Sequence, residues 1–215
     1  MIAAAIPRAI VSIPFAFMLA GCATLSALGD ASTPLGVYDL RAPEGAPVAR
    51  GRPLARDVVV ELPTTSGVLN TDRILIRPDE LQAQYLPDVR WGDDVPVLMQ
   101  TLMLRALENT GGLQYVGRTP LAGSGDYAIV TELIDFHAEL GEGSDGANIL
   151  IRMTSRMVRE SDARVVASRT FSSRAVAAST ETPTLIKAFD EASDQLLIQF
   201  ADWTMTSLGR RLSTS

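Results

Sequence analysis

Cysteine and histidine are nearly absent from this chain of 215 residues, which contains one of each, Cys22 and His137. A single cysteine excludes an intramolecular disulfide and a cysteine-based zinc cluster, so the fold has to be stabilised by its apolar core. A single histidine means that any Ser-His-Asp or Cys-His catalytic arrangement would have to use His137. Catalytic and metal sites that need several cysteines or histidines are therefore excluded.

An excess of positive charge is also missing, because 25 acidic residues outnumber 19 lysines and arginines, for a formal net charge of −6. Such a chain is repelled on average by nucleic acid and by anionic lipid headgroups. We therefore expect no nucleic-acid partner. The hydrophobic content of 47% is typical of a packed globule, and the length is appropriate for one domain.

The apolar run near the N-terminus is too short to cross a bilayer, which takes about 20 residues. Arg8 precedes an uncharged run over 9–20, and small residues follow before Cys22, which is the pattern of a secretory signal. The order Leu19-Ala20-Gly21-Cys22 closely resembles the lipobox of bacterial lipoproteins. This resemblance implies that residues 1–21 are a signal peptide that is removed, and that Cys22 carries a diacylglycerol and an acyl chain such as palmitate.

The lipobox resemblance also predicts a location. Two anchoring signals already hold a protein stably at a membrane, so three acyl chains on Cys22 would attach it permanently. In bacterial lipoproteins an Asp directly after the cysteine usually means retention at the inner membrane, and this chain has Ala23. We therefore expect the periplasmic side of the outer membrane, with the inner membrane as the less favoured alternative.

Three segments are expected after the signal peptide. Residues 22–36 are small and polar without periodicity and indicate a flexible, lipidated tether. Residues 37–209 have the periodicity of one α+β domain, and 210–215 form a short C-terminal tail. Early strands of this domain are predicted at 37–40, 57–62, 74–76, 84–86 and 113–116.

A hairpin is the clearest local prediction. A strand over 127–140 is followed by a loop at 141–146 and a returning strand over 147–160, and a turn near Asp162 leads to a third strand over 164–176. If Leu140 pairs with Ala147, Asp135 lies opposite Arg152, a pair worth roughly 0.2–1 kcal/mol.

Each strand of the hairpin is expected to have an apolar and a polar face. On the first strand, Val130, Ile134, Phe136 and Leu140 alternate with Asp135, His137 and Glu139, apart from exceptions such as Glu132; on the second, Ile149, Ile151, Met153 and Met157 alternate with Arg152, Thr154 and Arg156. A half-buried antiparallel sheet usually turns its charged face to water.

Two long helices are predicted, over 94–110 and 183–208, with Asp94 and Thr182 placed to cap them. Their apolar residues recur at three- and four-residue steps and include Leu98, Met99, Leu102, Met103, Leu107, Leu185, Phe189, Leu196, Phe200 and Trp203. The spacing favours core packing over a Met-rich binding groove or a Trp203 anchor. The predicted fold is α+β, a mostly antiparallel β-sheet with two main helices packed against it.

His137 is the one candidate for catalysis, with Asp135 and Glu139 on the same strand face to orient it. The competing interpretation, which we favour, is that this charged face is simply solvated. Carboxylate pairs such as Asp93-Asp94 lie in helix-cap or turn positions, and the glycines of the 141–146 loop lack the following helix of a phosphate site. We expect no cofactor, no metal site and no enzymatic activity.

Several short motifs in one order resemble the auxiliary lipoproteins of ABC-type transport systems that carry MCE (mammalian cell entry) domain proteins. They are Val37-Tyr38-Asp39-Leu40, Arg73-Ile74-Leu75-Ile76-Arg77-Pro78, Tyr85 followed by Arg90-Trp91-Gly92-Asp93, a helix over 102–109 that ends at Gly-Gly, Phe171 in a late strand and Trp203 in the last helix. Arg-Trp with a nearby Asp is the most specific motif. The resemblance covers about Tyr38 to Thr206.

The resemblance implies an outer-membrane component, without enzymatic activity, that docks a periplasmic MCE protein while a permease and an ATPase act at the inner membrane. Lipid would move between the two membranes, and homo-oligomerisation is plausible by the same resemblance. Tyr85, Arg90 and Trp91 are the candidate partner interface, at the start of a helix, since aromatic and Arg side chains are common at interfaces. The alternative is that Trp91 packs under the helix and Arg90 pairs with Asp93 or Asp94.

Two other function classes fit the same plan of anchor, tether and domain. One is an outer-membrane lipoprotein that activates or pilots another envelope machine, such as a cell-wall synthase or a secretin. The other is a lipid-anchored hydrolase that uses His137. A neighbouring gene for an MCE protein favours the transport role over the first alternative, and replacement of His137 by Gln tests the second.

Overall fold

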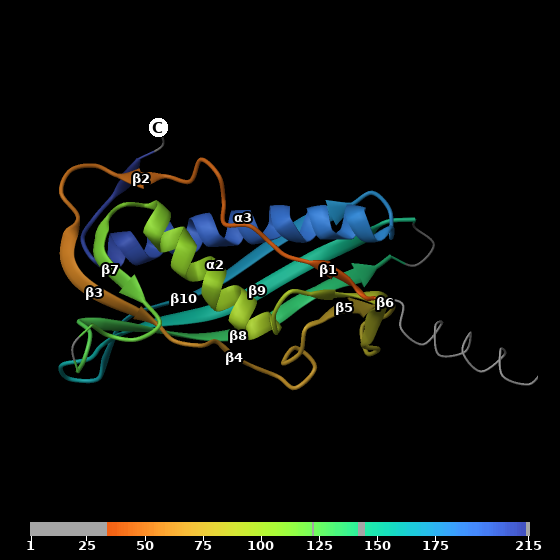
Figure 1. The fold of residues 1–215 in the computed structure, drawn as a ribbon, viewed down its shortest axis with the longest axis horizontal. Helices are drawn as coiled ribbons and strands as arrows, with labels where there is room; N and C mark the ends of the chain where they lie inside the picture. Colours follow the sequence, from red (N-terminus) through yellow and green to blue (C-terminus); the bar gives the residue numbers. More distant parts are fainter. Residues whose placement is uncertain (1–33, 122, 142–144, 214–215) are drawn as a thin grey trace, which may run out of the picture. The chain divides into compact units, whose positions relative to one another are not determined.

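Two helices and a mixed β-sheet make up the part of the chain that the computed structural model describes, residues 34–121, 123–141 and 145–213 (Figure 1). The compact unit begins at Gly36. Its elements are β1 Gly36–Tyr38, β2 Val48–Ala49, β3 Leu54–Val60, β4 Thr64–Thr65, β5 Arg73–Arg77, β6 Gln84–Trp91, α2 Val95–Asn109, β7 Leu113–Gly117, β8 Tyr127–Leu140, β9 Ala147–Arg159, β10 Arg164–Ala177, α3 Thr182–Ser207 and β11 Leu212–Ser213. Cys22, the predicted signal peptide and most of the predicted tether lie outside the described residues.

Three long antiparallel strands, β8, β9 and β10, form the body of the sheet and run side by side (Figure 1). The predicted hairpin register is confirmed, because Leu140 pairs with Ala147 and Asp135 with Arg152. The Arg152 Nε donates to Asp135 Oδ2 at 2.7 Å, and its second nitrogen lies 2.6 Å from the same oxygen. The predicted cross-strand ion pair therefore forms.

The predicted alternation on β8 is wrong in its first half. The pairing with β9 shifts between Leu133 and Asp135, which leaves Ile134 as an extra, bulged residue. A bulge reverses which face the following side chains take. Ile134 is therefore exposed and Val130 half-buried, whereas Ile129 and Leu133 before the bulge and Phe136 after it are buried.

Short strands extend the sheet beyond β8, mostly in parallel. Strands β3, β4 and β5 pair one after another along β8, all parallel, while β6 joins β5 antiparallel. Strands β1 and β7 pair in parallel with β6 and β3, and β2 with β11 forms a separate two-stranded sheet. The long ladders are antiparallel and most of the short strands join the sheet in parallel. With the two helices, this arrangement confirms the α+β class.

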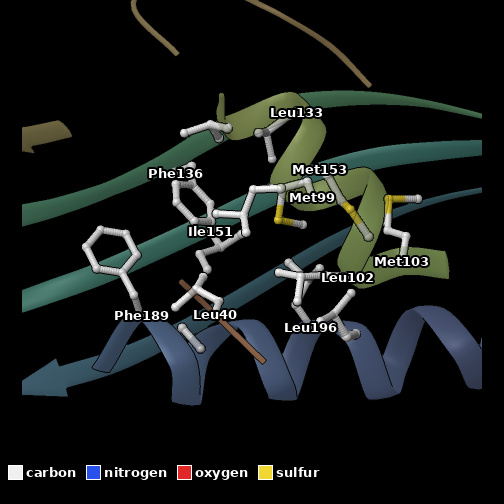
Figure 2. Packing of buried hydrophobic residues seen from close by; sticks show 14 of the residues in the cluster. Leu40, Met99, Leu102, Met103, Leu133, Phe136, Ile151, Met153, Phe189 and Leu196 are labelled. Atoms are coloured by element: carbon white, nitrogen blue, oxygen red, sulfur yellow. The ribbon is translucent and has the colours of Figure 1, made fainter. Parts of the chain in front are cut away.

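Helix α2 lies within its predicted boundaries and α3 begins one residue before its predicted range, at Thr182. Both helices share one core with the inward side chains of β8 and β9 (Figure 2). The N-terminal capping of the two helices differs from the prediction. Asp94 holds the N-cap position of α2 without a side-chain cap hydrogen bond, and Glu181 replaces Thr182 as the residue before α3. Prolines in both first turns remove amide groups that would have no partner within the helix.

The core contains two aromatic groups that join α3 to the sheet. Phe136 and Phe189 contact Trp91, and Phe171 and Phe200 contact Trp203. The methionines at helical spacing are core residues as predicted, since Met99 and Met103 are fully buried and belong to the packed cluster (Figure 2). No helix among the described residues has the length and apolarity needed to cross a membrane.

Candidate functional site

Tyr85, Arg90 and Trp91 lie on strand β6, so their predicted position at the start of a helix is wrong. Strand β6 pairs with β5 on one side and β1 on the other. Pro87 and Asp88 interrupt its middle, and Asp88 has a positive φ of 60°. A proline and a residue in the left-handed region weaken the strand pattern in the sequence, which is why only 84–86 were predicted as strand.

Trp91 is 0% exposed, so its side chain presents no surface to a partner. The indole packs edge to face on Phe136 and Phe189, with ring centroids 5.7 Å and 5.3 Å away. The interpretation of Trp91 as a core residue is therefore correct. Arg90 donates to Asp72 Oδ2 at 3.1 Å, so its ion-pair partner is Asp72 and not the predicted Asp93 or Asp94.

Tyr85 keeps the character of a surface residue, with 39% of its area exposed. Its hydroxyl donates to the carbonyl oxygen of Val68 at 3.0 Å, and the Arg73 guanidinium lies 5.8 Å from its ring centroid. Val68 is itself an exposed apolar residue. Tyr85 therefore belongs to a small surface formed by β6 and the segment before β5.

A hollow of about 1050 Å³ lies on the face of the sheet that points away from the two helices. We call it the outer hollow. Its lining comes from β8, β9, β10 and the segment that follows β5, and consists of Arg77, Pro78, Asp79, Glu80, Leu81, Asp135, His137, Glu139, Leu140, Gly141, Asn148, Leu150, Arg152, Ser172 and Arg174. Charged side chains of both signs dominate this lining.

His137 faces the outer hollow but is only 3% exposed, so the predicted solvated position of this side chain is wrong. The charged face is covered near His137 because β5 pairs with the end of β8, which places Arg77 beside Glu139. Residues 78–81 then continue along the hollow. Burial lowers the pKa of His137, while a hydrogen bond with Glu139 opposes this and raises it.

The ring nitrogens of His137 both lie near carboxylates. Nε2 is 3.4 Å from Glu139 Oε1, and Nδ1 is 3.8 Å from Asp135 Oδ1. Asp135 is in turn held by Arg152. A general base needs a ring nitrogen within hydrogen-bond reach of a nucleophile. The geometry instead makes His137 part of a polar network that joins β8 to β9.

A second group of carboxylates lies where the segment after β1 meets α3. Asp190 Oδ1 accepts a hydrogen bond from the Arg41 amide at 3.2 Å. Burial, and then the charges of Asp190 and Glu44, raise the pKa of Asp194 to about 6. Within the described ranges, no group of three or more histidines, cysteines or carboxylates has the arrangement of a metal site.

The outer hollow could not be found from the sequence. Its two halves come from the β8–β10 body and from the segment after β5, which meet only through a parallel pairing between distant residues. The only local sequence feature in the segment after β5 is a turn at Asp79. Its Oδ1 accepts hydrogen bonds from the Leu81 and Gln82 amides, and Asp is a typical turn residue. Cys22, the predicted lipid-attachment residue, lies outside the described part of the chain.

Comparison with known proteins identifies relatives over most of the domain. The family model described as "ABC-type transport auxiliary lipoprotein component" matches residues 38–201. An uncharacterised protein of Bradyrhizobium diazoefficiens is 26% identical over 172 residues, which is 80% of this chain and 45% of the relative. The chain therefore spans less than half the length of this curated relative.

Solved structures share the fold. A protein of Xanthomonas campestris superposes with a TM-score of 0.70 and 23% identity, over 80% of this chain and 96% of that one. A further crystal structure of an uncharacterised protein gives a TM-score of 0.62 at 13% identity, over 79% of this chain and 98% of the other. At sequence identities of 23% and 13%, this structural similarity supports the fold alone and no particular function.

Proposed function

Because this chain belongs to the family of ABC-type transport auxiliary lipoprotein components, we propose that it is the outer-membrane accessory of an MCE-type ABC transporter that moves lipid between membranes. The family match is the observation that carries the proposal. It extends from β1 into α3 and so includes the whole β8–β10 body. Membership of this family supports a location in the cell envelope and an association with an ABC transport system.

Attachment to the membrane would come from Cys22. The lipobox at 19–22 and the short apolar leader before it support a lipid anchor on this residue. A chain covers at most about 3.5 Å per residue, so the segment 22–36 would hold the domain up to some tens of ångströms from the membrane. The periplasmic side of the outer membrane is the proposed location, since Ala23 and not Asp follows the cysteine.

Residues 37–209 are proposed to dock a partner protein. They are not proposed to carry lipid inside the domain. The outer hollow presents Arg77, Asp135, Glu139, Arg152 and Arg174 to any occupant. Charged groups that lose water against an acyl chain raise the free energy steeply. This lining therefore favours a function in which the domain binds the MCE protein while lipid moves elsewhere in the assembly. No catalytic step is proposed.

Tyr85 and Arg90 are the proposed contact residues for the MCE protein. Tyr85 is exposed beside Val68, and Leu81 before β6 is 95% exposed. Tyrosine and arginine with nearby aliphatic side chains are typical of interface centres. Trp91, which was predicted with them, would act only by holding β6 in the core.

Affinity capture from detergent-solubilised envelopes, followed by mass spectrometry, tests this proposal. Recovery of an MCE-domain protein with its permease and ATPase is the expected result. Tyr85→Ala should reduce that recovery, whereas Tyr115→Ala, at a tyrosine on the distant strand β7, should leave it unchanged. Recovery of a cell-wall synthase or a secretin without an MCE protein would contradict the transport role and support the activator or pilot alternative.

A further inference from the structure

Strands β9 and β10 are basic in a chain that is acidic overall. Neither contains Asp, Glu or Lys, and together they contain Arg152, Arg156, Arg159, Arg164, Arg169 and Arg174. All six side chains are exposed. Arg152 pairs with Asp135 and Arg159 with Asp162, so these two charges are compensated locally. The arginines of β10 form no ion pair within the described ranges.

Strand β10 is an edge of the sheet. It has 14 residues and pairs with β9 alone among the described strands. Its first half, from Arg164 to Thr170, is exposed or half-buried at every residue, although Ala167 packs against the core and a bulge at Val166 interrupts the pairing with β9. Val165 is 56% exposed in this half. From Ala167 to Ala177 the register with β9 is regular, and an edge strand of this length leaves a row of backbone N–H and C=O groups ready to pair with another strand.

The arginines of β10 are five residues apart, at 164, 169 and 174. Arg169 and Arg174 take opposite faces, since side chains alternate along a strand. Arg169 lies 5.1 Å from the ring centroid of Phe171, on the helix side, and Arg174 lines the outer hollow on the other side. A strand added beside β10 would meet both charges at once.

We propose that the edge of β10 binds an extended, acidic segment of a partner protein, which adds to the sheet as a further strand. Backbone pairing would supply much of the affinity, as in other cases of strand addition. Carboxylates opposite Arg164, Arg169 and Arg174 would select the partner, because oppositely charged cross-strand neighbours are favourable. Apolar residues between them would cover Val165 and Val166.

A second copy of the same strand fits this edge poorly in the register centred on Arg169. In that twofold antiparallel pair Arg169 would lie opposite its own copy. Like charges directly across a ladder are destabilising. An anionic membrane surface fits poorly as well, because a plane cannot contact Arg169 and Arg174 on opposite faces of one sheet. This inference does not depend on which transport system the protein serves.

The test uses a designed probe and the full-length chain in neutral detergent. The probe is a twelve-residue Thr/Val peptide with Glu at positions 1, 6 and 11, labelled for fluorescence anisotropy. We expect it to bind at low ionic strength, to weaken with salt and to slow amide hydrogen exchange in β10. The same peptide with Gln in place of Glu should bind roughly tenfold more weakly.

Variants locate the site on the edge strand. Arg169→Gln combined with Arg174→Gln removes two of the three charge pairs and should weaken binding of the Glu peptide by roughly fivefold. Arg156→Gln removes an exposed arginine from β9, which is not an edge, and serves as the matched control with little expected change. Circular dichroism and thermal unfolding of each variant should match the unmodified chain, since all three side chains are exposed.

Three outcomes would overturn the proposal. Equal binding of the Glu and Gln peptides would show that the arginines do not select the ligand. A Glu peptide N-methylated at alternate residues lacks the N–H groups needed for strand pairing. If it bound as tightly as the unmethylated Glu peptide, the attraction would be by charge without strand pairing. Binding of anionic phosphatidylglycerol vesicles that depends on Arg169 and Arg174, with no binding of the peptide, would make this face a membrane contact.

Discussion

Trp91 joins three elements at the level of a single residue, because it lies on β6 and contacts Phe136 of β8 and Phe189 of α3. Replacement by Ala should lower the free energy of unfolding by about 3–5 kcal/mol, as expected for a large buried aromatic side chain. Trp91→Phe should cost less, since the indole Nε1 has no hydrogen-bond partner among the described residues. Urea unfolding followed by circular dichroism measures both values, and a loss below about 1 kcal/mol for Trp91→Ala would contradict the packing.

The bulge at Ile134 is the feature of β8 that decides which side chains reach the core. It lies between the stretch of β8 that pairs with β4, up to Leu133, and the stretch that pairs with β5, from Ala138. Without the extra residue, the charged side chains of 135–139 would face the helices and Phe136 would face the outer hollow.

Deletion of Ile134 should therefore prevent cooperative folding or reduce the unfolding temperature severely. Ile134→Thr keeps the bulge and changes an exposed side chain, so it should alter stability by no more than about 0.5 kcal/mol. Thermal unfolding with near-ultraviolet circular dichroism distinguishes the two variants. A deletion variant with native stability would show that β8 can shift its register without loss.

Two titrating groups, His137 and Asp194, make opposite contributions to the pH dependence of the free energy of unfolding of the whole molecule. Burial lowers the pKa of His137 below 6.5, so just below that pH the unfolded chain binds more protons and stability falls as pH falls. The pKa of Asp194 is raised from 3.8 to about 6, so within that window the native state holds more protons and stability falls as pH rises.

Unfolding free energies measured from pH 4 to pH 8 should separate these contributions. His137→Gln should remove the loss of stability on acidification below pH 6.5, and Asp194→Asn should remove the opposing loss between about pH 4 and pH 6. Asp194→Asn should also be slightly more stable than the unmodified chain at pH 7, because it removes a partly buried charge beside Asp190. Profiles of the two variants that coincide with the unmodified chain would contradict both assignments.

Local patterns predicted the elements whose contacts are local. Residues 94–110 and 183–208 show helical spacing, and α2 and α3 follow it within a few residues. The hairpin of β8 and β9 has a short connection, so its register could be predicted to the pair Asp135–Arg152. Cys22 and its leader are recognisable without any fold, because the lipobox is a contiguous pattern.

Local periodicity by itself thus determined an α+β chain with two amphipathic helices and one long hairpin, and the lipobox resemblance added a candidate lipid anchor at Cys22. The tertiary structure decided that Trp91 is buried, that His137 is covered and that β10 remains an edge. These outcomes depend on β3, β4 and β5 pairing with the other side of β8 in parallel, and on β6 pairing with β5. Parallel partners need long connections and leave no short-range signal, so the candidate surfaces could be located only once the chain was folded.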